Sequence, residues 1–336
     1  MDYRSEAPQL IKEFLIFHET IKGHSKKTVN EYYLDLRTFF RYIKYKRGLV
    51  NADITEISGI DISDVGLELI ASVTLTDVYD FLSYLSRDRE IRYNLPAAGT
   101  GLSASSRSRK ISCIRSFYKY LTEKVNIISE NPVKNLDSPK LRQSLPRYLS
   151  LEQSISLLGA VSGKYRERDY CILTLFLNCG LRISELCGVN ISDIVSDSIR
   201  ILGKGNKERT VFLNDSCMAA LDDYLTVRRS LPAVEHSSRN ALFISRENRR
   251  ISPSTVHVLV KKYFAAAGID QKQYSAHKLR HTAATLMHQN GVDVRTLQEI
   301  LGHENLNTTQ IYTHVDNNEL RLATKANPLN KVKKPK

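Results

Sequence analysis

The chain lacks the features that mark secreted, zinc-stapled and membrane proteins. Its five cysteines are an odd number with no Cys-x-x-Cys pair, which argues against a disulfide framework and a structural zinc site. It does not open with a positively charged start and an apolar run, and no apolar stretch approaches the ~18 residues of a membrane helix. These absences predict a cytoplasmic protein.

The chain also has fewer acidic than basic residues. Lysine and arginine number 49 against 36 acidic residues, which gives a net charge of +13 over 336 residues. A basic surface releases counterions from nucleic acid and steers encounter with it, so the charge favours a polyanionic partner. Charge alone would also fit a merely soluble basic protein. The length allows two domains, each with its own core.

The first 125 residues or so have a helical pattern. Apolar and aromatic positions recur at helical spacing over 28–45 and again over 103–124. On the second helix one side is apolar, and the other carries hydroxyls and cations that could contact DNA phosphates: Ser108, Ser112, Arg115 and Lys119. The alternative for this polar stripe is a solvated helix face.

The segment 48–86 is unusual in a basic protein because it carries seven acidic side chains and no lysine or arginine. Such a segment should face away from phosphates, so we expect it at the outer surface or in a subunit contact.

The stretch 131–149 has the composition of a linker. Pro132, Pro139 and Pro146 alternate with cations that include Lys140 and Arg142. Prolines at this spacing stop helices and favour an extended backbone, so we expect a basic linker that crosses a groove and contacts DNA.

The second half predicts helices around a small hairpin. An apolar helix over 170–179 should end at Gly180, and two alternating segments, 199–202 and 209–212, should pair around a turn over 203–206. A helix from His277 should end at Gly291. Another, capped by Asp293, should end at Gly302.

Six residues in this half have the functional groups needed to attack a phosphodiester without a metal: Arg182, Lys204, His277, Arg280, His303 and Tyr312. Two arginines can hold the non-bridging oxygens of one phosphate, and a tyrosine hydroxyl can attack the phosphorus in line. A lysine and two histidines can move protons and bind the remaining oxygens.

The segments around these residues add specificity. They read Gly180-Leu-Arg-Ile-Ser-Glu-Leu186, Gly203-Lys-Gly-Asn-Lys-Glu-Arg209, His277-Lys-Leu-Arg-His281 and Leu301-Gly-His303, followed by Tyr312. In order, spacing and flanks the second half of the chain resembles the tyrosine recombinase (phage integrase) family. The stretch from Gly203 to Arg209 is most similar to its Xer branch.

The resemblance implies a mainly α fold with two domains arranged as a clamp around DNA. We expect a helical core-type DNA-binding domain of SAM-like fold over 1–136 and the linker over 137–149. An α-rich catalytic domain with a small antiparallel sheet follows over 150–336. We expect no further domain before the helical one, so integrases with an extra N-terminal module for distant arm sites should fit less well.

The resemblance also implies the chemistry. Arg182 and Arg280 would hold the scissile phosphate, and Tyr312 would attack it to leave a 3′-phosphotyrosine and a free 5′-hydroxyl. Lys204 would protonate the leaving oxygen, His277 would accept the tyrosine proton, and His303 would donate a hydrogen bond to the phosphate. No metal, ATP or other cofactor is expected.

The implied function is site-specific recombination through a Holliday junction, as integration, excision or chromosome dimer resolution. The partner would be duplex DNA with paired inverted half-sites. The protein would act as a homo-tetramer, or a hetero-tetramer with a paralogue, joined through a C-terminal tail over 317–336. This tail carries an apolar stripe made of Leu320, Leu322, Ala323 and Ala326.

Three alternative functions fit the sequence less well. His277 and His281 have metal-ligand spacing and with His303 could suggest zinc, but position 278 is lysine, so the His-Glu-x-x-His pattern fails. A type IB topoisomerase would use similar chemistry without needing the tail. A catalytically silent DNA-binding relative should have lost one of the six residues, and none is missing.

Overall fold

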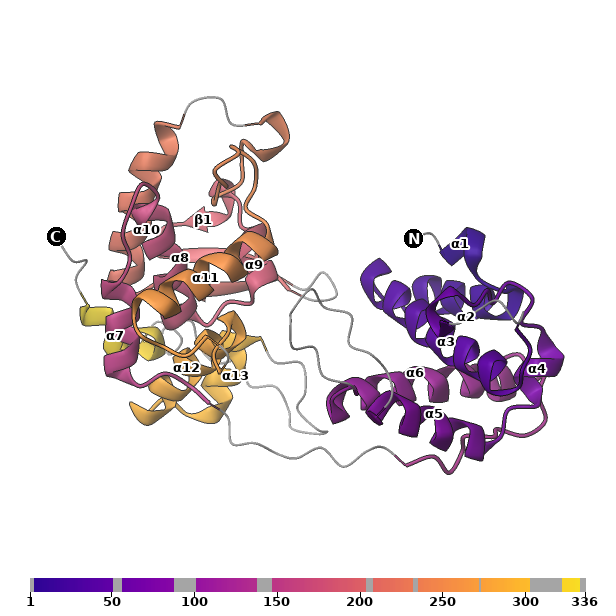
Figure 1. Ribbon diagram of the computed structural model, residues 1–336. Helices are drawn as coiled ribbons and strands as arrows, with labels where there is room; N and C mark the ends of the chain where they lie inside the picture. The colour runs from indigo at the N-terminus through magenta and orange to yellow at the C-terminus, as the bar shows by residue number, and fades with distance from the viewer. Residues whose placement is uncertain are drawn as a thin grey trace. The chain divides into compact units, whose positions relative to one another are not determined.

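The computed structural model has two compact units, Met1–Gln143 and Ser144–Lys336 (Figure 1). The structure describes residues 3–50, 56–87, 101–137, 147–203, 208–231, 235–271, 273–302 and 322–332. Each unit has a hydrophobic core of its own. Within these ranges no helix is both long and apolar enough to cross a membrane.

The described part of the first unit is helical throughout. Its helices are α1 (Tyr3–Glu6), α2 (Gln9–Thr20), α3 (Lys26–Lys46), α4 (Leu67–Ala71), α5 (Leu75–Arg87) and α6 (Ala104–Glu123), with a 3-10 turn η1 (Ile57–Gly59). The two long helices expected from periodicity are therefore confirmed as α3 and α6. Each begins at a serine whose hydroxyl accepts a backbone N–H, Ser25 from Thr28 and Ser103 from Ser106.

The core of this unit forms where α3 and α6 pack together. The apolar side of α6 is fully buried through Ile111, Ile114, Tyr118 and Leu121. A partly buried ion cluster also joins the two helices, because the buried Asp35 of α3 accepts hydrogen bonds from Arg109 and Lys110 of α6. A buried carboxylate is tolerated only when it is paired in this way. The cluster fixes which side of α6 turns away from the core.

Three carboxylates of the acidic segment make ion pairs with the end of α3. Asp77 accepts from Lys46 at 2.9 Å and from Arg47 at 2.8 Å, while Asp64 pairs with Lys44 and Asp80 with Lys46. Cations in the last turn of a helix also suit its dipole. Part of the acidic charge is thus neutralised within the unit, which the composition of 48–86 did not indicate.

The second unit combines helices with one small sheet. Its helices are α7 (Leu151–Gly159), α8 (Arg166–Cys179), α9 (Ile183–Gly188), α10 (Asp215–Arg229), α11 (Pro253–Ala266), α12 (Ala276–Gln289) and α13 (Val294–Leu301), with 3-10 turns η2 (Ile191–Asp193), η4 (His236–Ser238) and η5 (Pro328–Lys331). Helix α7 begins at Ser150, which forms a capping box with Gln153. Asp293 likewise caps α13.

The sheet contains the predicted hairpin. Strands β1 (Ile194–Val195), β2 (Ser198–Leu202) and β3 (Glu208–Phe212) are antiparallel in the order β1-β2-β3, with Ile199 opposite Val211. Ile199, Ile201 and Val211 are buried, so one face of the hairpin joins the core. The turn that joins β2 to β3, with Lys204, falls outside the described residues.

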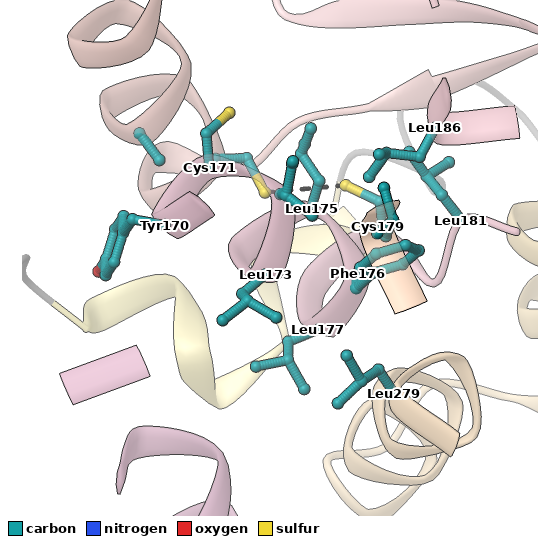
Figure 2. Close-up of a cluster of buried hydrophobic side chains, with 14 of the residues drawn as sticks. Tyr170, Cys171, Leu173, Leu175, Phe176, Leu177, Cys179, Leu181, Leu186 and Leu279 are labelled. Carbon is teal, nitrogen blue, oxygen red and sulfur yellow. Dashed lines mark hydrogen bonds between the residues drawn. The ribbon is translucent and has the colours of Figure 1, made fainter. Parts of the chain in front are cut away.

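Helix α8 runs through the centre of the second core. Nearly every side chain from Asp169 to Cys179 is buried, and Leu177 points toward Leu279 of α12 (Figure 2). All five cysteines are free and buried, and a buried thiol packs as a small apolar group. Because the side chains of α8 are packed on all sides, the core holds the C-terminus of this helix in place. The residues that follow it are positioned accordingly.

Candidate active site

The first candidate arginine stands at the junction of α8 and α9. Helix α8 ends at Gly180, whose φ of 61° is left-handed, and a Cβ there would lie 2.6 Å from the Leu301 side chain. Only glycine allows both this turn and this approach of α13. Arg182 follows as the residue that precedes α9.

Glu185, in the first turn of α9, orients Arg182. It accepts the Arg182 backbone N–H at 2.8 Å through Oε2 and the guanidinium Nη1 at 2.6 Å through Oε1. The side chain of Arg182 keeps 37 % of its surface exposed while that of Glu185 keeps 3 %. The arginine is therefore held from the buried side and open to solvent on the other.

The second candidate arginine is buried beside the first. Arg280 of α12 donates to the carbonyl of Gly180 at 2.7 Å and to that of Leu301 at 2.6 Å. Its Nη1 also lies 3.9 Å from Glu185 Oε2. Burial and the neighbouring Arg182 lower the pKa of Arg280 to about 10, so the guanidinium remains charged at neutral pH.

A third arginine completes the cluster. Arg209 of β3 binds Glu185 with its two terminal guanidinium nitrogens, Nη1 to Oε1 at 2.9 Å and Nη2 to Oε2 at 3.0 Å. Burial alone would raise the pKa of Glu185, but the hydrogen bonds from Arg209 and Arg182 outweigh it and lower that pKa to about 2. Three guanidinium groups around one carboxylate leave positive charge in excess, which suits an anionic ligand.

The C-terminus of α13 meets the same three arginines. The carbonyls of Ile300, Leu301 and Gly302 accept from Arg209 Nε at 3.4 Å, Arg280 Nη2 at 2.6 Å and Arg182 Nη2 at 3.0 Å, in that order. Carbonyls at a helix C-terminus have no partner within the helix and carry its partial negative charge. The cluster thereby fixes the point at which the chain continues to His303.

His277 lies on the first turn of α12, one turn before Arg280. Its ring packs edge-to-face against that of His281, with the ring centroids 4.8 Å apart, and is partly covered by it, although the residue as a whole is exposed. Partial burial and the cations of Arg280, Lys278 and Arg182 lower the pKa of His277 below its usual value. The ring is therefore mainly neutral at pH 7, the form that can accept a proton.

The structure thus brings together three of the six predicted catalytic residues, Arg182, His277 and Arg280. Lys204, His303 and Tyr312 lie outside the described residues. Glu185 and Arg209 belong to the cluster as well, and both lie in segments singled out in the sequence, 180–186 and 203–209. The sequence assigned no task to Arg209.

The predicted DNA contacts of the first unit lie on α6. Ser112 and Lys119 are exposed and Ser108 and Arg115 are half-buried, on the side away from the buried apolar stripe. Ser112 donates to the Ser108 carbonyl at 3.0 Å, and Lys119 lies 3.6 Å from Glu123. Lys140 and Arg142 belong to the stretch 138–146, which is not among the described residues.

Comparison with known proteins identifies the family. Residues 147–319 match the phage integrase family model. The chain is 50 % identical to tyrosine recombinase XerC of Caldanaerobacter subterraneus subsp. tengcongensis, covering 96 % of this chain and 87 % of the relative. It is 34 % identical to tyrosine recombinase XerD of Rickettsia conorii over 76 % of this chain and 91 % of that one.

The fold agrees with these sequence relationships. The chain superimposes on XerH site-specific recombinase bound to a palindromic difH substrate with a TM-score of 0.64 at 23 % identity, covering 93 % of this chain and 83 % of that one. The expected recombinase fold, mainly helical with a small antiparallel sheet, is confirmed. The chain belongs to the phage integrase family, as a site-specific tyrosine recombinase most similar to the Xer branch.

Proposed function

We propose that this recombinase cuts one DNA strand by attack of Tyr312 on a phosphate held by Arg182 and Arg280, and rejoins strands by the reverse reaction through a Holliday junction. The observation that carries the proposal is the arginine cluster around Glu185, which keeps two phosphate-binding cations fixed before DNA arrives. Cations fixed in advance stabilise the charge that develops in the transition state without reorganisation.

The remaining residues carry out the proton transfers. Neutral His277 accepts the proton of the tyrosine hydroxyl as the phenolic oxygen bonds to phosphorus. Lys204 donates a proton to the 5′-oxygen as its bond to phosphorus breaks, and His303 donates a hydrogen bond to a non-bridging oxygen. The phosphotyrosine link conserves the bond energy for rejoining. The scheme needs no metal, ATP or other cofactor.

The two units would hold duplex DNA between them as a clamp. The α6 stripe of Ser108, Ser112, Arg115 and Lys119 would contact phosphates, and Lys140 and Arg142 would follow the backbone from the linker. We propose a core-binding role for residues 1–136 and a catalytic role for 150–336. A site of two inverted half-sites, each bound by one protomer, fits this arrangement. An enzyme that recombines bacterial DNA would act in the cytoplasm, where that DNA lies.

Strand cleavage in excess EDTA tests the metal-free scheme. A nicked half-site that traps the covalent intermediate should give the protein–DNA adduct at the same rate with and without chelator, because arginines and a lysine supply all the positive charge. The readout is the adduct band on a denaturing gel. Loss of the adduct with EDTA, restored by a divalent ion, would show that a metal takes part.

We further propose that protomers assemble into a tetramer, with themselves or with a paralogue, through the tail. The tail also packs on its own unit: Leu329 is fully buried, and Asn327 donates to the Leu177 carbonyl at 2.9 Å. Of the apolar stripe, Ala323 is buried while Leu322 is 68 % exposed. A deletion of 317–336 would therefore unfold part of the core, whereas Leu322 is available to a neighbour.

Leu322→Ser is the sharper test of this assembly. The variant should bind a single site as well as wild type but pair two sites and recombine them about tenfold less, since an exposed leucine at a packed contact contributes roughly 1.5 kcal/mol. Gel shifts and a two-site recombination assay separate the steps. Val258→Ser, which removes a valine with 69 % exposure from α11, is the control. Normal recombination by Leu322→Ser would rule out this contact.

A further inference from the structure

Arg209 makes three hydrogen bonds within the site, as many as Arg182 and more than Arg280, yet the proposed mechanism gives it no step. It is the second residue of β3, five positions after Lys204 in the sequence. From there it binds both oxygens of Glu185 and reaches the carbonyl of Ile300 at the end of α13. Its side chain is only 16 % exposed.

The end of α13 is fitted against this arginine. Gly302 is left-handed with a φ of 65°, and a Cβ there would lie 3.1 Å from Cδ and Nε of Arg209. The Cδ and Nε atoms of Arg209 thus occupy the space that a side chain at position 302 would need. Arg209 joins three parts of the unit at one point: the start of β3, the first turn of α9 and the residue before His303.

The charge balance shows what Arg209 does for Glu185. A carboxylate has about four acceptor positions, and Arg209 fills two of them with its pair of parallel bonds. The Arg182 backbone and guanidinium fill two more. Without Arg209, a buried carboxylate with two open positions would draw in the nearest cation, and Arg280 Nη1 is only 3.9 Å away. An Arg280 drawn onto Glu185 would leave its carbonyl partners and be less available to a phosphate.

We propose that Arg209 is a positioning residue for the phosphate clamp: it saturates Glu185 so that this carboxylate orients Arg182 without capturing Arg280, and it fixes the end of α13. The proposal rests on the proposed function, since it concerns the same phosphate. Arg209 itself does not touch the DNA in this scheme. Its effect should therefore appear in the rate of cleavage and not in the affinity for the site.

The first experiment compares Arg209→Ala with wild type in single-turnover cleavage. We use a substrate with sulfur in place of the bridging 5′-oxygen, because the thiol released is a poor nucleophile for rejoining and the product accumulates. Arg209→Ala should cleave about 10- to 100-fold more slowly, the loss typical of a partner that orients a site residue, and bind the site within about threefold of wild type. Rates are scaled to the folded fraction measured by thermal melting.

Two matched variants separate positioning from simple stabilisation. Arg228 is a buried arginine of α10 that donates to the carbonyls of Ala241 and Arg239, in the same unit but outside the cluster. Arg228→Ala should lower the melting temperature without slowing cleavage per folded molecule. Arg209→Lys keeps the charge but cannot make the paired bonds, so it should recover at most a small part of the rate. Full recovery with lysine would overturn the geometric part of the proposal.

A double-mutant cycle gives the decisive readout. If Arg209 acts through the charge of Glu185 on the clamp, its removal should matter little once that charge is gone, so Glu185→Gln with Arg209→Ala should cleave within about threefold of Glu185→Gln alone. Multiplied defects would overturn the proposal, as would a wild-type rate for Arg209→Ala. If wild-type protein itself formed no covalent adduct with this substrate, the proposed function would fail instead.

Discussion

Tyr312→Phe should abolish the covalent protein–DNA adduct while leaving the affinity for the site within a few-fold of wild type. Phenylalanine keeps the ring and removes only the hydroxyl oxygen that bonds to phosphorus, so binding contacts remain and the attack is lost. The adduct on a nicked half-site is measured on a denaturing gel, and the affinity by gel shift. Because no other nucleophile is proposed, the expected loss of adduct is complete.

A tyrosine that packs away from the cluster provides the control. Tyr165 lies under Arg168, with the guanidinium carbon 4.5 Å from the ring centroid, and Tyr165→Phe keeps that packing. It should form the adduct at the wild-type rate. A covalent adduct with Tyr312→Phe would move the nucleophile to another residue and refute the role given to Tyr312.

Lys204→Ala should be about 100- to 10,000-fold slower than wild type on ordinary DNA, the range by which general acids contribute, but close to wild type on the sulfur-bridged substrate. The 5′-oxygen is a poor leaving group that needs a proton as its bond to phosphorus breaks. A sulfur leaving group departs without one, so the general acid becomes unnecessary. Single-turnover cleavage of the two substrates by the same preparation gives the ratio directly.

Arg182→Ala is the matched variant for this test because it removes a cation of the clamp and not the acid. Its loss of charge stabilisation, about 100- to 1,000-fold by analogy with removal of one oxyanion donor, should persist on both substrates. Equal defects of Lys204→Ala on oxygen and sulfur substrates would show that the lysine holds the phosphate. Lys207 and His277 would then be the acids to test.

Local sequence determined most of the secondary structure near the site. Serines at 103 and 150, Asp293, and glycines at 180 and 302 act through their own backbone neighbours, so the ends of α6, α7, α8 and α13 could be predicted. The alternation around the Lys204 turn likewise predicted β2 and β3. The start of α8 was missed by four residues, because Arg166-Glu-Arg-Asp169 is charged and only its packing shows that it is helical.

The acidic segment shows what composition leaves out. Its lack of cations predicted the outer surface or a subunit contact, and the structure adds that Asp64, Asp77 and Asp80 pair with lysines and an arginine just before the segment. The pairing requires α5 to pack beside the end of α3. A count of charges within 48–86 carries no information about that packing.

The sequence by itself determined the family and predicted the chemistry, because the residue types and their order match those of the proposed phosphate clamp with a tyrosine nucleophile. Only the tertiary structure decided how the clamp is held. Arg182 meets the carbonyl of Gly302, and Arg280 meets that of Gly180, across 120 and 100 residues of chain. Such contacts depend on how α8, α12 and α13 pack. The sequence offers several carboxylates that could pair with Arg209. The folded unit buries Glu185 of α9 beside Arg209, and this packing makes Glu185 the partner.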